Sequence, residues 1–182
     1  IASESGYPLL SGQLIEVVAK RGGAAAHLAR GMDSWIEGND TSAKLHFRVA
    51  DRLEPNALVV VRYAALYLAR EGSSAITVFN GQNKSAYQRS FELLDLVDEV
   101  DFKQAVPTLW SRCYILSLRS DWTGVIKLLD SRVGEFDGPE RKQAYDWLIR
   151  AYSGIGDEDK ANVYQQAMRN TVKALREQNN ER

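Results

Sequence analysis

The sequence has few of the residues that build disulfides, metal sites or membrane anchors. Cys113 is the single cysteine and there are only two histidines, so neither an internal disulfide nor a thiolate metal cluster can form. No run of about 18 apolar residues is present, and the first residues lack the basic start and apolar core of a signal peptide. We therefore expect no direct membrane insertion of this segment.

The chain begins at Ile1 rather than at a methionine. We therefore expect it to be a fragment or a processed product of a longer protein. That origin leaves the cytoplasm and the periplasm both open as locations, and it leaves the oligomeric state open.

The sequence also lacks an excess of either charge. Its 23 Lys and Arg residues nearly balance its 24 Asp and Glu residues, for a net charge of −1, which predicts no overall attraction to nucleic acid or to an anionic membrane. The 182 residues are 45% hydrophobic and 26% charged, as in ordinary folded proteins. This length suits one domain or a short array of repeats.

The segment from Ala24 to Asn56 has the pattern of two short helices that cross closely. Gly31 falls inside the first helix, where a small residue lets two helix axes approach each other. Gly38 and Asn39 predict a tight turn, after which Ala43, Phe47 and Ala50 share one face of the second helix. We expect Phe47 to cover the gap that Gly31 leaves.

This segment resembles a tetratricopeptide repeat. Ala43 and Phe47 match the A-x3-F core of that repeat, and Pro55 matches its terminal proline. The order of the helix pairs also resembles the repeat region of a larger bacterial tetratricopeptide protein. The resemblance implies a right-handed α-solenoid that binds a protein or peptide partner.

Later segments repeat the pattern at similar intervals. The turns at Gly38 and Gly72 are 34 residues apart, which is the period of this repeat. Residues 73–84 contain β-prone residues and the turn signal Asn80-Gly81, so we expect an irregular insertion outside the helical stack. Ser85 is placed to cap the helix that follows, and Pro107 opens a third pair.

We therefore predict an all-α fold of about four antiparallel helix pairs, with a capping helix before them and an insertion in the second pair. Val60, Ala64, Ala65 and Leu68 are expected on the buried face of the second pair's first helix, and Tyr164 beside Ala161 in the core of the last pair. The predicted divisions are an extended lead 1–12, a repeat domain 13–176 with pairs at about 24–56, 57–100, 107–138 and 140–170, and a frayed tail 177–182.

The polar residues give little support to catalysis, because catalysis needs groups that converge in a closed pocket. His27 and His46 belong to different helices without a metal-binding pattern, so we predict no metal site. Cys113 lies on an apolar helix face, as an inert core thiol would. The acidic residues of 92–101 have the spacing of a helix face and lack the central glycine of a calcium loop. We predict no catalytic residue and no cofactor.

Binding is the more plausible role, because the first helix of each stacked pair lines a concave surface. Steps of 34, 48 and 36 residues, taken from the turn positions, identify equivalent positions on successive first helices. Trp, Tyr and Arg are the side chains that most often dominate recognition. The predicted partner-binding residues are Leu28, Met32, Arg62, Leu66, Trp110, Tyr114, Asp146 and Arg150.

Two hypotheses about function follow. In the first, the chain is a non-enzymatic scaffold or adaptor that binds a peptide or protein partner on its concave face, as one segment of a larger assembly protein. In the alternative, it is a regulatory or targeting domain that docks an adjoining enzyme or membrane-anchored domain. The sequence of the full-length product would separate them.

Overall fold

The computed structural model describes residues 22–71, 76–79 and 82–180. Apart from one β-hairpin, these residues form helices, so the all-α prediction is confirmed. The predicted lead and capping helix lie outside the described residues. The chain divides into two compact units, residues 1–115 and 116–182, which we describe separately.

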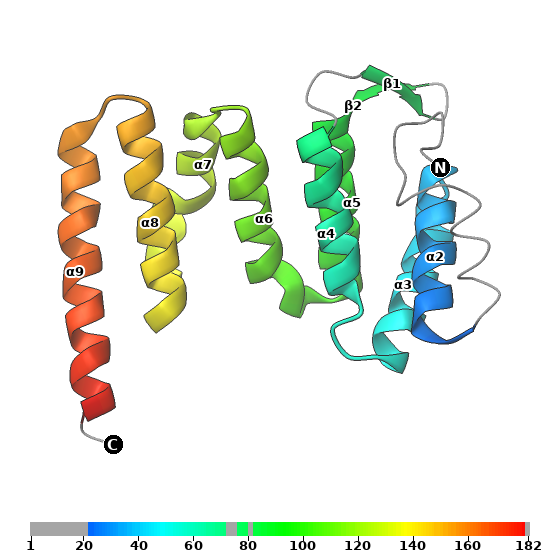
Figure 1. Cartoon of the computed structure of the whole chain (residues 1–182), viewed down its shortest axis with the longest axis horizontal. Helices are drawn as coiled ribbons and strands as arrows, with labels where there is room; N and C mark the ends of the chain where they lie inside the picture. Colours follow the sequence, from blue (N-terminus) through cyan, green and yellow to red (C-terminus); the bar gives the residue numbers. More distant parts are fainter. Residues whose placement is uncertain (1–21, 72–75, 80–81, 181–182) are drawn as a thin grey trace. The chain divides into compact units, whose positions relative to one another are not determined.

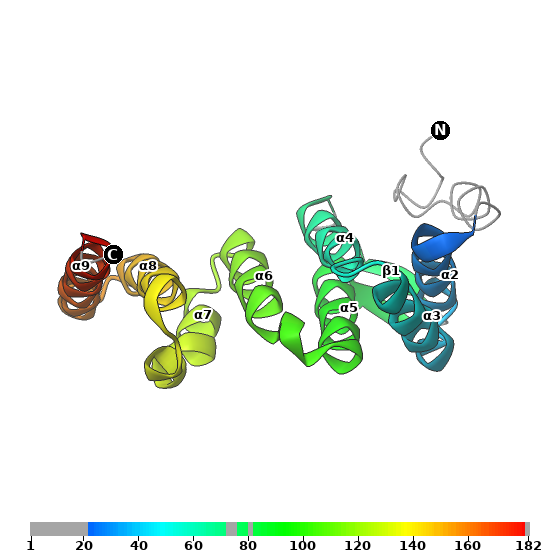
Figure 2. The same ribbon diagram turned by 90° about the horizontal axis from the view of Figure 1, so that it is seen from below.

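The elements of the first unit are α2 (Gly23–Ile36), α3 (Asp40–Leu53), α4 (Leu58–Glu71), β1 (Ile76–Phe79), β2 (Gln82–Ser85), α5 (Ala86–Val100), the short 3-10 helix η2 (Phe102–Gln104) and α6 (Ala105–Leu118), whose last residues belong to the second unit. Helix α2 packs against α3, and α4 packs against α5 (Figure 1). The two pairs also touch, α2 against α4 and α3 against α5 (Figure 2).

The α2–α3 pair has the close crossing that its sequence predicts. Phe47, Ala43 and Ala50 are fully buried, and a Cβ placed on Gly31 would lie 2.6 Å from Cδ1 of Phe47. Any larger residue at position 31 would therefore have to displace the ring or the helix. Asn39 begins α3 by accepting a 3.1 Å hydrogen bond from the Ser42 amide, which satisfies one free N–H of the first turn.

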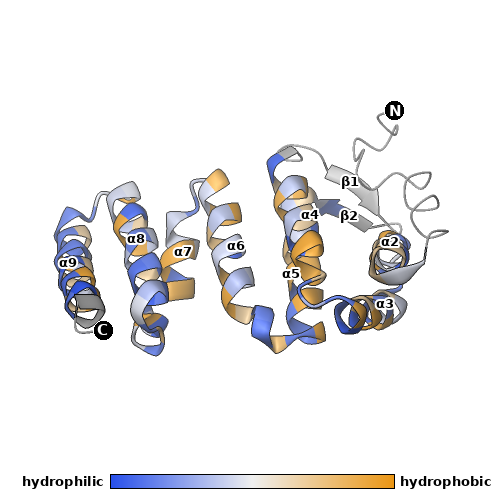
Figure 3. Cartoon of the chain, turned by 60° about the horizontal axis from the view of Figure 1, so that its bottom comes forward, coloured by the Kyte–Doolittle hydropathy of each residue, from blue (hydrophilic) through white to orange (hydrophobic). Residues whose placement is uncertain are grey.

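The α4–α5 pair contributes most of the first unit's core and carries many hydrophobic residues (Figure 3). In α4 the buried face is shifted from the predicted one. Val61, Ala65 and Leu68 are buried, whereas Val60 is 59% exposed, so the assignment of Val60 to the core is wrong. The run of apolar residues 57–61 has no polar residue to fix a register, which is why the periodicity misplaced it.

The predicted insertion contains a β-hairpin rather than an irregular loop. Strands β1 and β2 pair antiparallel, with Ile76 opposite Ser85 and Phe79 opposite Gln82. Residues 73–75 and 80–81 of the predicted insertion lie outside the described residues. Ser85 then caps α5 as predicted: its hydroxyl accepts from the Gln88 amide at 3.2 Å, and the Gln88 side chain accepts from the Ser85 amide at 2.9 Å.

The second unit contains the end of α6, then α7 (Trp122–Leu129), the 3-10 helix η3 (Asp130–Glu135), α8 (Gly138–Gly154) and α9 (Glu158–Asn180). Helices α8 and α9 lie side by side and α7 packs against α8. Ala161 is 3% exposed, but Tyr164 is only half-buried, so its expected position in the core is corrected to the edge of the core. Helix α9 continues to Asn180, past the start of the predicted frayed tail.

A half-buried carboxylate ties η3 to the last helix pair. One oxygen of Asp130 accepts hydrogen bonds from the hydroxyls of Tyr152, at 2.8 Å, and Tyr164, at 2.6 Å. Burial, then the bond to Asp130, raises the pKa of Tyr164 well above its usual range. The three residues come from three elements, so their hydrogen bonds fix the position of η3 against α8 and α9.

Candidate functional site

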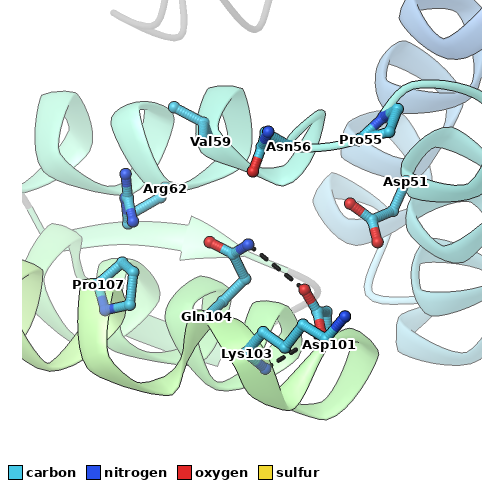
Figure 4. Close-up of a pocket in the computed structure, with 9 residues that line it drawn as sticks. All are labelled: Asp51, Pro55, Asn56, Val59, Arg62, Asp101, Lys103, Gln104 and Pro107. Atoms are coloured by element: carbon cyan, nitrogen blue, oxygen red, sulfur yellow. Dashed lines mark hydrogen bonds between the residues drawn. The ribbon is translucent and has the colours of Figure 1, made fainter.

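A pocket of about 410 Å³ opens in the first unit where α3 ends and α6 begins (Figure 4). It contains charged groups of both signs, two amide side chains and three apolar residues. Its volume lies within the roughly 300 to 1,000 Å³ of typical ligand pockets. The lining residues are Asp51, Pro55, Asn56, Val59, Arg62, Asp101, Lys103, Gln104 and Pro107.

One wall forms where the chain turns from α3 into α4. Glu54 ends α3 in an extended conformation, and Pro55 follows, since proline cannot continue the helix's hydrogen bonding. Asn56 has a φ of 71°, a left-handed conformation that asparagine tolerates better than most residues. This turn carries Asn56, Val59 and Arg62 along one side of the pocket.

The opposite wall forms where α5 passes into η2. Asp101 ends α5 in an extended conformation and accepts hydrogen bonds from the Lys103 amide, at 3.1 Å, and from Nε2 of Gln104, at 3.4 Å. These bonds hold η2 against the end of α5. Gln104 is only 7% exposed, and Pro107 follows in the first turn of α6.

The charges of the pocket are separated along its length. Figure 4 shows Arg62 and Pro107 toward one end, Asp51 and Asp101 toward the other, and Gln104 between them. Burial, then the neighbouring Asp101 carboxylate, raises the pKa of Asp51, while Lys103 partly offsets this effect.

Two of these charged groups form no hydrogen bond or ion pair with the described residues. Within the described residues, neither the Asp51 carboxylate nor the Arg62 guanidinium has a hydrogen-bond or ion-pair partner. The guanidinium does lie 6.0 Å from the centre of the Tyr63 ring, at the outer limit of a cation–π contact. Both charged groups are therefore available to a ligand.

Two large aromatic residues adjoin pocket residues in the sequence. Tyr63 follows Arg62 and is 62% exposed, and Phe102 stands between Asp101 and Lys103 in the sequence and is 79% exposed. Arginine and aromatic side chains are enriched at protein-binding surfaces.

Some of the predicted site residues of the first unit lie at the surface, and others pack in or against the core. Arg62 lines the pocket and Tyr114 is 38% exposed, while Trp110 is half-buried. Met32, by contrast, is a core residue with 7% exposure, and Leu28 and Leu66 are half-buried against the same core. We therefore leave Met32 out of the proposed binding surface.

The two predicted site residues of the second unit pair with each other. Arg150 and Asp146 form an ion pair of 2.8 Å across one turn of α8, and the Arg150 guanidinium lies 5.6 Å from the Trp147 ring. Such exposed pairs contribute about 0.3 to 0.5 kcal/mol on a helix surface. Arg150 remains accessible, and a partner that binds it must replace this weak pairing.

The structure brings the two histidines together, which the sequence spacing does not suggest. Nδ1 of His27 in α2 lies 3.1 Å from Nδ1 of His46 in α3. Burial, followed by the charges of His27 and Arg30, lowers the pKa of His46. Within the described residues no group of three or more metal-ligating side chains converges.

The acidic face of α5 is occupied by salt bridges. Arg112 of α6 reaches Asp95 at 2.6 Å and Asp98 at 2.7 Å, and Lys84 of β2 reaches Glu92 at 2.6 Å. Lys44 pairs with Glu99. These carboxylates thus join α5 to its neighbours.

Cys113 is the buried core thiol that the sequence predicts. Burial raises its pKa to about 12, so the reactive thiolate form is suppressed at neutral pH. In the part of the chain that the structure describes, no helix is both long and apolar enough to cross a membrane.

Apart from Arg62, the polar residues that line the pocket were not predicted as site residues, nor were the exposed rings next to them in the sequence: Asp51, Asn56, Asp101, Lys103, Gln104, Tyr63 and Phe102. Asp51 and Lys103 lie 52 residues apart, so only the packing of the two helix pairs places them at one pocket. Phe102 did carry a signal, because a large aromatic in a polar connection between helices has no predicted core partner.

A scan against protein-family models found no match to this chain, and neither did searches of curated proteins and of solved structures.

Proposed function

We propose that this chain is a non-enzymatic scaffold that binds a peptide or protein segment on the first unit, at the pocket beside Arg62 and on the surface next to it. The resemblance to tetratricopeptide repeats belongs to the same proposal, together with the right-handed stacking of helix pairs that it implies. The function itself rests on the site rather than on the fold, since one fold supports many functions.

The observation that carries the proposal is the Arg62 guanidinium, which lines the pocket without a hydrogen-bond or ion-pair partner among the described residues and lies 6.0 Å from the exposed Tyr63 ring. Arginine and aromatic residues supply much of the binding energy at protein interfaces, and they act best where the partner excludes water from them. Tyr63 and Phe102 adjoin pocket residues in the sequence and provide exposed rings. A peptide could place a side chain in the pocket while its neighbours cover these rings.

The helical framework suits this role because it holds the pocket walls in place. The α3–α4 turn begins from a fully buried face of α3, and η2 is fixed by the hydrogen bonds of Asp101. Little order therefore has to be created on binding, and preformed sites lose less affinity to the entropy of ordering.

The test is selection of peptides from a random displayed library against the full chain. The affinity of a selected peptide is then measured by calorimetry for the wild type, for Arg62→Ala and for Arg48→Ala. Arg48 is an exposed arginine of α3 that does not line the pocket, so it is the matched control.

We expect Arg62→Ala to weaken binding by at least about 2 kcal/mol, or roughly thirtyfold, as truncation of a dominant interface residue does. Arg48→Ala should bind like the wild type. Equal affinity of all three proteins would mean that the peptide does not bind at the pocket. Failure to select any peptide would contradict the proposal.

A further inference from the structure

The pocket of the first unit contains two opposite charges without an ion-pair partner. A half-buried carboxylate, Asp51, and a guanidinium, Arg62, lie at its opposite ends, and neither forms a hydrogen bond or an ion pair with the described residues. A charge that loses part of its hydration needs a partner of opposite sign. A ligand that neutralised only one end would leave the other charge unpaired.

The middle of the pocket presents the chemistry that a peptide backbone requires. Asn56 and Gln104 each carry a carbonyl acceptor and an NH2 donor, which match the N–H and C=O groups of a peptide bond. Gln104 uses one donor for Asp101, so its carbonyl oxygen is still available. Pro55, Val59 and Pro107 supply apolar surface between these polar groups.

We infer that this pocket binds a short extended peptide segment that carries one positive and one negative side chain, the positive group against Asp51 and the negative group against Arg62. This inference rests on the proposed function, since it names the chemistry of the segment that the scaffold recognises. Asp101 strengthens the attraction for a cation at one end, and Lys103 moderates it.

The inference predicts a preference for mixed charge over like charge. The probes are four blocked tripeptides, so that only their side chains are charged: acetyl-Lys-Ala-Glu-amide, acetyl-Glu-Ala-Lys-amide, acetyl-Lys-Ala-Lys-amide and acetyl-Glu-Ala-Glu-amide. Two orders of the mixed peptide are included because an extended segment can enter in either direction. Binding to the full chain is followed by the shifts of its backbone amide signals in NMR spectra.

We expect at least one mixed peptide to bind about tenfold more tightly than either like-charge peptide, with shifts concentrated in residues 51–62 and 101–107. Asp51→Asn and Arg62→Gln should each abolish the preference, whereas Arg48→Gln should retain it. Arg62→Glu should reverse the specificity toward the Lys-Ala-Lys peptide, because both ends of the pocket would then be acidic. This reversal is a gain of binding that a destabilised protein would not show.

Three results would overturn the inference: no binding of any tripeptide, equal binding of mixed and like-charge peptides, or an unchanged preference in Arg62→Glu. They are distinguishable from failure of the proposed function. If displayed peptides without paired charges bind the same face and depend on Arg62, the scaffold function stands and only the mixed-charge specificity is wrong.

Discussion

Because α2 and α3 cross closely, we expect the effect of Gly31→Ala on stability to change sign with the residue at position 47. In Gly31→Ala the new Cβ would lie 2.6 Å from Cδ1 of Phe47, whose ring is fully buried and cannot move into solvent. Such overpacking costs about 1 to 3 kcal/mol, whereas replacing glycine by alanine inside a helix gains about 1 kcal/mol. We expect a net destabilisation of up to about 2 kcal/mol.

The same substitution should become stabilising once the ring is gone. Phe47→Ala alone should cost about 3 to 5 kcal/mol, as expected for loss of a buried aromatic side chain. In that background the methyl group of Gly31→Ala meets no ring, so only the helix-propensity gain of about 1 kcal/mol remains. The two residues should therefore show a coupling energy of about 1 to 3 kcal/mol.

The assay is urea denaturation followed by circular dichroism and by tryptophan fluorescence, to which the buried Trp35 of the first unit contributes. Gly134→Ala is the control, because a Cβ there would meet nothing within 4 Å. If Phe47→Ala does not fold, Phe47→Leu provides a milder background. A stabilising effect of Gly31→Ala in the wild type would refute the close-crossing account.

Three further predictions concern other contacts. Gly154→Ala should destabilise the second unit in urea titrations, because its Cβ would lie 2.6 Å from Cγ of Trp122, and should do so less in a Trp122→Leu background. Asp130→Asn should lower the pKa of Tyr164 in an ultraviolet titration. Because that pKa is raised in the folded state, its stabilising effect is complete below the usual tyrosine pKa of 10.0 and is lost as the pH rises toward the folded-state pKa. The lowered pKa of His46 gives the opposite pH dependence. Its contribution to stability is present above pH 6.5 and is lost as the pH falls through the folded-state pKa, so His46→Gln should flatten the acidic side of the curve of stability against pH.

Each of these predictions has an outcome that opposes it. Equal destabilisation by Gly154→Ala in both backgrounds would mean that Trp122 is not the obstacle. An unchanged pKa of Tyr164 in Asp130→Asn would mean that the Asp130 carboxylate does not raise it. An unchanged loss of stability at acidic pH in His46→Gln would mean that His46 does not contribute to that loss.

Much of the helical layout was predictable because local chemistry decides it. Ser85 begins a helix and Pro55 follows one for reasons contained in a few neighbouring residues. The pairing of Gly31 with Phe47 was predictable too, since a small residue opposite a large one is a complementary pair. The register of Val60 was not, because an all-apolar run leaves the buried face undetermined.

The candidate site was less predictable because it depends on contacts between distant segments. Arg62 was identified from its repeat position, and it does line the pocket. Asp51, the opposite charge at the other end of the pocket, has nothing in the sequence to distinguish it from any polar residue near the end of a helix. The histidine pair shows the same limit: His27 and His46 meet because antiparallel helices place them opposite each other, which their spacing does not reveal.

The most direct test of the scaffold function is a hydrogen-exchange map of the full chain with and without a peptide selected from the displayed library. We expect added protection in two separate segments of the first unit, residues 51–63 and 101–114, because they contain the residues that line the pocket and the exposed rings of Tyr63, Phe102 and Tyr114. Substitution of Arg62 by alanine should remove the protection in both segments together. Protection confined to other helices, or retained in full by Arg62→Ala, would contradict the account.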